Sequence, residues 1–155
     1  MNKFLLPLVA LYVVLALPAA HAQSATSNPA GAPAPADDAL FRALGGLAGI
    51  DAIVGDFVPR LVADPRTGEF FRKTDQAHLK LMLAQQFCVV SGGGCIYTGL
   101  PMKKAHENID VAKGDFNALV EVLQASMSAR GMPFSTQNQL LARLAPMHRE
   151  IVNVH

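Results

Sequence analysis

The strongest constraint on the fold of this chain is the spacing of its apolar residues, which recur every three or four positions from residue 50 to residue 151. That period lines them along one face of an α-helix, whereas a half-buried strand would alternate apolar and polar residues. The repeating sets, which include one glutamine, are Ile50, Ile53, Val54, Phe57, Leu61 and Val62; Leu79, Met82, Leu83, Gln86, Phe87 and Val90; Phe116, Leu119, Val120, Leu123 and Met127; and Leu140, Leu141, Leu144, Met147 and Ile151. No run of alternating β-branched residues competes with them, so the sequence predicts an all-α fold.

Capping residues and a proline predict where some of these helices begin and end. Thr74 is expected to cap a helix over residues 75–90. Thr136 with Gln139 forms a capping-box pattern ahead of the last helix. Pro59 cannot donate a backbone hydrogen bond, so we expect it to kink or shorten the first long helix.

The first 22 residues have the pattern of a secretory signal peptide. Lys3 supplies a positive charge, residues 4–17 are apolar, and Ala20-His21-Ala22 is the small-x-small pattern of a cleavage site. The apolar stretch is short for a membrane span, so a cleaved signal is favoured over a stable anchor. The sequence therefore predicts a periplasmic or secreted protein.

The composition changes again after the predicted cleavage site. Residues 23–36 are rich in Ala, Pro and Ser and carry neither charge nor a periodic apolar face, so we expect a disordered linker. Residues 37–155 are long enough for one folded domain and too short for two.

The charge balance and the motifs present exclude several functions. The chain has 13 basic and 12 acidic residues and no basic run with interleaved aromatics, so nucleic acid is not an expected partner. No nucleophile stands with a base, and no carboxylates pair at a recognisable spacing. Residues 92–94 are a glycine run that follows a predicted helix rather than a strand, so they do not predict a phosphate-binding loop.

His106 is the one histidine whose setting points to a metal. The glycines at 92–94 and Pro101 break the preceding helix, which places His106 on a short helical turn. Such a turn can aim one ring nitrogen at a flat ligand while the other meets a backbone acceptor. A lone histidine on a short helix is more often a surface or core residue, so the spacing alone leaves this open.

Short motifs follow one another over roughly residues 39 to 152. They are Leu44-Gly45-Gly46, Glu69-Phe70-Phe71, Gly-Gly-Gly-Cys-Ile-Tyr-Thr-Gly at 92–99, Met102-Lys103-Lys104-Ala105-His106 and Leu144-Ala145-Pro146. In order and spacing they resemble the truncated haemoglobins of the first group. The resemblance implies a two-over-two helical sandwich that binds haem, with His106 as the proximal iron ligand and Phe71 on the haem face.

Haem needs two apolar walls, which this chain can supply around His106. The candidate wall residues are Phe57, Phe70, Phe71, Leu79, Leu83, Phe87, Phe116 and Leu119, and the predicted cofactor-binding set also includes Val58, Met82, Tyr97 and Met102. Each would equally be an ordinary core residue in any helical bundle. The chain has no Cys-x-x-Cys-His motif, so the expected cofactor is haem b.

The predicted distal pocket is apolar. Many members of the resembled group have a tyrosine where this chain has Val58 and a glutamine where it has Leu83, and these groups hold oxygen by hydrogen bonds. Leu79 is also apolar. The missing donors remove roughly 1 to 3 kcal/mol of stabilisation, so tight oxygen storage is not expected.

Met82 is a candidate sixth iron ligand, because some members of the resembled group send a histidine or lysine to the iron from this position. A thioether is a good ligand for ferrous haem. His78 is a second candidate. The alternative for Met82 is a flexible core filler.

Three functions are compatible with these residues. The first is an exported haem globin that binds O₂, NO or CO, with NO dioxygenase or peroxidase-like side activity left open. The second is an electron-transfer haem protein with a redox partner and a sixth ligand from Met82 or His78. The third is a haem-free helical binding module.

Cys88 and Cys95 are the only two cysteines. Export would favour a disulfide worth about 2 to 3 kcal/mol. The alternative is a pair of buried thiols, since cysteines near these positions also occur in cytoplasmic members of the resembled group.

Overall fold

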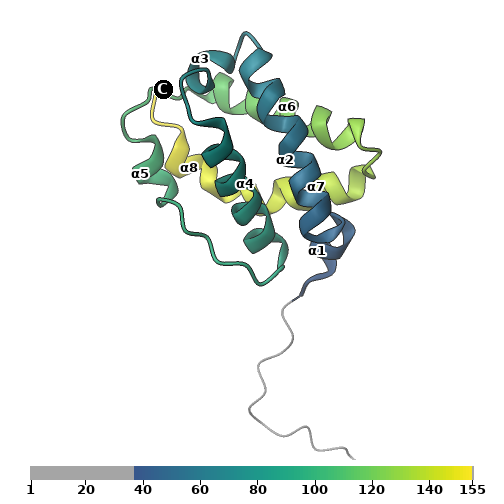
Figure 1. Cartoon of the computed structure of the whole chain (residues 1–155). Coiled ribbons are helices and arrows are strands. Elements are labelled where there is room, and N and C mark those ends of the chain that lie inside the picture. Colours follow the sequence, from purple (N-terminus) through teal and green to yellow (C-terminus); the bar gives the residue numbers. More distant parts are fainter. Residues whose placement is uncertain (1–36, 155) are drawn as a thin grey trace, which may run out of the picture. The chain divides into compact units, whose positions relative to one another are not determined.

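The computed structural model describes residues 37–154, so the predicted signal peptide and linker lie outside the described residues (Figure 1). The helices are α1 (Ala39–Ala43), α2 (Gly46–Ala63), α3 (Gly68–Phe71), α4 (Gln76–Ser91), α5 (Met102–His106), α6 (Lys113–Ala129), α7 (Phe134–Leu144), the 3-10 turn η1 (Ala145–Met147) and α8 (His148–Ile151). Within this part of the chain the β-structure is a single bridge between Ala112 and Val154. The all-α prediction is confirmed.

The four longest helices form a two-over-two sandwich. Helix α2 packs against α4 and α6, and α7 packs against the same two helices (Figure 1). Their apolar faces meet in one core, whose buried residues are Leu40, Leu44, Ile50, Ile53, Val54, Phe57, Val58, Leu61, Phe87, Cys88, Val122, Leu123, Met127 and Leu140. The apolar sets read from the sequence thus supply the core of the sandwich. None of the helices within residues 37–154 has both the length and the apolar character needed to cross a membrane.

Helix α4 is capped by Asp75 rather than Thr74, so the predicted cap is wrong by one residue. The Asp75 carboxylate accepts from the backbone N–H groups of Ala77 and His78 at 2.9 and 3.1 Å. The Thr74 hydroxyl instead donates to the Phe70 carbonyl at 3.3 Å. Asp75 has an extended backbone, and its carboxylate accepts from two N–H groups that lack partners within the helix. The Thr74 hydroxyl is already bonded at the end of α3.

The predicted capping box at Thr136 is also wrong. Helix α7 begins at Phe134, and the backbone N–H groups of Thr136 and Gln137 donate to the Pro133 carbonyl at 3.0 and 3.1 Å. Thr136 therefore lies inside the first turn, where its side chain is buried. Proline before the helix sets the starting geometry without a side-chain cap.

Pro59 does not shorten α2, which continues to Ala63. Phe57, Val58 and Leu61 are buried on both sides of the proline. Burial of these side chains contributes several kcal/mol, which offsets the roughly 3 kcal/mol that a proline costs inside a helix.

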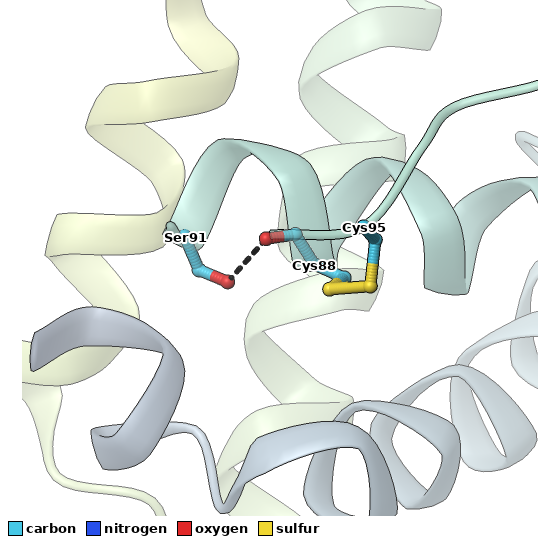
Figure 2. The surroundings of a disulfide bond; sticks show 3 residues. All are labelled: Cys88, Ser91 and Cys95. Carbon is cyan, nitrogen blue, oxygen red and sulfur yellow. Dashed lines mark hydrogen bonds between the residues drawn. A yellow bond between two sulfur atoms is a disulfide. The ribbon is translucent and has the colours of Figure 1, made fainter. Parts of the chain in front are cut away.

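The connection from α4 to α5 starts with a glycine turn and a disulfide. Gly92 has φ +89°, and a Cβ there would lie 2.2 Å from the Asp37 carbonyl oxygen, so only glycine fits. Figure 2 shows Cys88, on α4, bonded to Cys95 in the segment beyond the turn. The Ser91 hydroxyl donates to the Cys88 carbonyl at 3.1 Å. Of the two alternatives for the cysteines, the structure has the disulfide.

A polar contact fixes the same connection further along. The Gln85 side-chain oxygen accepts from both the backbone N–H and the hydroxyl of Thr98, each at 3.0 Å. Together with the disulfide, this contact ties the connecting segment to α4 at two points before it reaches α5, which packs beside α8 (Figure 1).

Candidate cofactor site around His106

His106 is the last residue of α5 and is half-buried. Its ring Nδ1 lies 2.7 Å from the Met102 carbonyl oxygen. A carbonyl oxygen can only accept, so Nδ1 donates this bond, and in the neutral imidazole Nε2 then keeps its lone pair. Among residues 37–154, Nε2 has no hydrogen-bond partner. This arrangement is typical of a metal-binding histidine, whose other ring nitrogen is held by a backbone acceptor.

The predicted cofactor-binding residues fall into two groups by burial. Phe57, Val58 and Phe87 are buried in the core between the helices. The half-buried ones are Phe70 and Phe71 of α3, Leu79, Met82 and Leu83 of α4, Tyr97, Met102 of α5 and Phe116 of α6. This second group keeps apolar surface that a flat ligand can cover.

A glutamine of α4 contacts one methionine of α5 and one of η1. The Gln86 side-chain nitrogen lies 3.3 Å from the Met102 sulfur and 3.2 Å from the Met147 sulfur. Met102 therefore makes two contacts at this site. Its carbonyl bonds to the His106 ring, and its side chain contacts Gln86 of α4. The sequence pattern put Gln86 and Met147 on apolar helix faces but did not assign them to the site.

A pocket of about 200 Å³ lies beside this contact. It is lined by Gln86, Val89, Val90, Tyr97, Pro101, Met102 and Met147. Two predicted residues, Tyr97 and Met102, thus lie together, while Leu79, Leu83 and Phe116 do not line this pocket. The Tyr97 phenol donates to the Leu100 carbonyl at 3.2 Å, and burial raises its pKa above the ordinary value.

The pocket volume bears on which cofactor fits. Pockets for drug-sized ligands are typically about 300 to 1,000 Å³. His106 does not line this pocket, and a volume of about 200 Å³ is smaller than a porphyrin needs. The donor set fits haem, because one imidazole nitrogen is free and the surrounding side chains are apolar.

Two polar side chains of α4 already have partners. Gln85 bonds to Thr98 and Gln86 contacts the two methionine sulfurs. His78 is exposed near the start of the helix. Leu79, Met82 and Leu83 are left as the half-buried residues at the positions predicted for the distal side.

The chain matches a known family along most of the described domain. The model of the family described as "Bacterial-like globin" matches residues 39–153, so the chain belongs to the bacterial-like globins. Its relatives include the group 1 truncated haemoglobin of Mycolicibacterium paratuberculosis, which is 30% identical over 112 residues covering 72% of this chain and 82% of the relative. That of Synechocystis sp. is 32% identical over 124 residues covering 74% of this chain and 97% of the relative. Within the family, the chain is a group 1 truncated globin, as its motifs indicated.

Solved structures share the fold. The truncated haemoglobin of Tetrahymena pyriformis in its Fe(III) form has a TM-score of 0.71 at 24% identity, covering 74% of this chain and 97% of that chain. The 2/2 haemoglobin of Synechococcus sp., in the cyanomet state with covalently attached haem, has a TM-score of 0.69 at 25% identity, covering 74% and 98% respectively. The predicted two-over-two fold is confirmed.

Proposed function

We propose that this chain is an exported globin that binds haem b through His106 and uses it to bind diatomic gases such as O₂, NO and CO. The observation that carries the proposal is the state of the His106 ring, whose Nδ1 donates to the Met102 carbonyl and whose Nε2 lone pair is free. Membership of the globin family supports it.

The residues of this chain would hold haem in distinct ways. Haem would supply an iron that one protein nitrogen can hold and that can bind a diatomic gas. His106 would provide that nitrogen, and the Met102 carbonyl would keep its ring oriented. Phe71 would pack on the haem face. Leu79, Met82 and Leu83 would keep water and hydrogen-bond donors away from the gas.

The haem is proposed to be type b because the sequence has no Cys-x-x-Cys-His motif. The Synechococcus structure, by contrast, is described as having covalently attached haem. Extraction into acidified organic solvent distinguishes the two cases. Haem b leaves the protein, whose mass then equals that of the polypeptide, whereas a haem that stays with the protein would exclude type b.

Export is proposed from the signal pattern of residues 1–22. The Cys88–Cys95 disulfide supports it, because disulfides persist mainly in oxidising compartments.

The decisive experiment is replacement of the ligand. His106→Ala should release haem, or bind it only with added imidazole, because the nitrogen that reaches the iron is gone. Glu107→Ala is the matched control, since Glu107 follows His106 in the chain, is exposed and should leave haem content unchanged. Full haem retention with an unchanged spectrum in His106→Ala would refute the assignment.

A second candidate function is electron transfer with a redox partner, favoured by the half-buried position of Met82 between Leu79 and Leu83 on α4. Ligation by Met82 would make the ferrous spectrum low-spin, and Met82→Leu would then convert it to high-spin. A five-coordinate ferrous spectrum in the wild type would instead favour the gas-binding globin. Absence of a haem absorption band would favour the third function, a haem-free helical binding module.

A further inference from the structure

Asn153, at the end of the chain, is bonded to the segment that follows His106. Its side-chain nitrogen donates to the carbonyls of His106 and Ile109 at 3.0 and 2.7 Å, and its side-chain oxygen accepts from the Val111 N–H at 2.8 Å. The backbone N–H groups of Asn153 and Val154 donate to the Val111 carbonyl at 3.1 and 3.2 Å.

Both N–H donors of the Asn153 side chain are used by these bonds, and its oxygen accepts one. An asparagine amide has two N–H donors and one oxygen, and here the donors meet two carbonyls while the oxygen meets an N–H. These partners therefore determine which end of the amide is the oxygen and which is the nitrogen. Aspartate would lose both donors, and alanine would lose all three bonds.

Helix α5 needs such support because it has only five residues. Helices this short are unstable in isolation, and their last carbonyls have no partner within the helix. The His106 carbonyl is one of these groups, and within residues 37–154 it accepts, apart from Asn153, only the Ile109 N–H at 3.3 Å. Asn153 therefore caps the carboxyl-terminal end of α5 by donating to the His106 carbonyl.

We propose that Asn153 is a positioning residue for the proximal histidine, fixing from the end of the chain the direction in which the His106 ring points. The inference rests on the proposed role of His106 as haem ligand. His106 then has two anchors. The Met102 carbonyl holds its ring from the beginning of α5, and Asn153 holds its backbone at the end.

Loss of the second anchor should loosen the bond between histidine and iron. Asn153→Ala lets the end of α5 fray, so the His106 ring samples orientations that fit the iron less well. We expect haem to dissociate about tenfold faster, as the loss of exposed hydrogen bonds of ordinary strength predicts. The iron–histidine stretching band of the ferrous protein should move to lower frequency and broaden.

The test compares three variants of the mature protein. Asn153→Ala removes all side-chain bonds, and Asn153→Asp keeps the acceptor for Val111 but loses both donors, so both should show the effect. Val154→Ala is the matched control, because Val154 bonds to Val111 through its backbone alone. The measurements are the iron–histidine band, haem transfer to an acceptor globin, and hydrogen exchange of the Ile109 and Val111 amides in the haem-free protein.

The outcomes separate this inference from the proposed function. Faster exchange of the Ile109 amide in both Asn153 variants, with a shifted band and faster haem release, supports the positioning role. Faster exchange with an unchanged band and unchanged release means that Asn153 only orders the tail, which overturns the inference but leaves His106 as the ligand. Unchanged exchange also overturns it. Failure of the wild type to bind haem would instead refute the proposed function.

Discussion

At the scale of single residues, neighbouring atoms decide what a side chain can do. The Met102 carbonyl sets the proton on Nδ1 of His106 and so leaves Nε2 as a Lewis base. On α4, the Gln85 amide is hydrogen-bonded to Thr98, and the Gln86 amide contacts the sulfurs of Met102 and Met147. The residues left at the proposed distal side carry no hydrogen-bond donor in their side chains.

The first prediction concerns this lack of donors. In the wild type, oxygen should leave quickly, whereas CO, which gains little from hydrogen bonds, should be held comparatively well. Leu83→Gln adds an amide donor at a half-buried position and should slow oxygen dissociation about tenfold. Stopped-flow and flash-photolysis measurements give both rates.

The matched control is Leu81→Gln, because Leu81 lies on the same helix with its side chain 53% exposed. It should leave the oxygen rate unchanged. A slow oxygen rate in the wild type that Leu83→Gln does not alter would mean that Gln86 or His78 reaches the gas after a shift of α4.

At the scale of elements, α4 carries the residues proposed for the distal side, and the segment after it leads to α5, which carries His106. Asp75 fixes where α4 begins, Gly92 fixes where it ends, and the disulfide and Gln85 tie the next segment back to it. Helix α5 is thus held by contacts that lie outside its own five residues.

The second prediction concerns the start of α4. Asp75→Ala should lower the free energy of unfolding by about 1 kcal/mol, because two backbone N–H groups lose their acceptor. Urea unfolding of the haem-free protein measures this change. Thr74→Ala should cost less, since its hydroxyl makes one exposed bond at 3.3 Å. Equal losses in the two variants would mean that Asp75 does not act as the cap.

The third prediction concerns the disulfide. Replacing both Cys88 and Cys95 by serine should lower the free energy of unfolding by about 2 to 3 kcal/mol, as expected for a short closed loop. A dithiol reductant should destabilise the wild type by a similar amount and leave the double variant unaffected. Equal stability of the oxidised wild type and the double variant would show that the bond contributes nothing to folding.

At the scale of the whole molecule, the chain combines a conserved type of fold with an amino-terminal segment outside the described residues. The family match covers residues 39–153, and the proposed export rests on the signal-peptide pattern of residues 1–22 that precedes it.

The fourth prediction is therefore that the mature protein begins at Gln23. Cleavage after Ala22 removes residues 1–22, and intact mass and amino-terminal sequencing of protein recovered from the periplasm measure the result. Changing Ala20 and Ala22 to bulky residues should block processing and is the matched control. Wild-type protein that keeps residues 1–22 and stays in the membrane fraction would indicate an anchor instead.

The fold was predictable from the sequence because its signal is local. Helical periodicity reports which face of a helix is apolar, and the sets around Phe57, Leu123 and Leu140 indeed lie in the core. Helix ends were less predictable, because Thr74 and Asp75 are both good caps and the choice depended on the Phe70 carbonyl nearby. The candidate ligand His106 was found from its turn and the surrounding motifs.

The sequence by itself determined the all-α class, the family and the turn that bears His106, since each follows from neighbouring residues or from the order of motifs. The tertiary structure alone decided which distant groups meet. Gln86 contacts Met147 across 61 positions, and Asn153 bonds to His106 across 47. A periodic pattern tells which face a side chain lies on but not its partner, because partners are selected only when the helices pack.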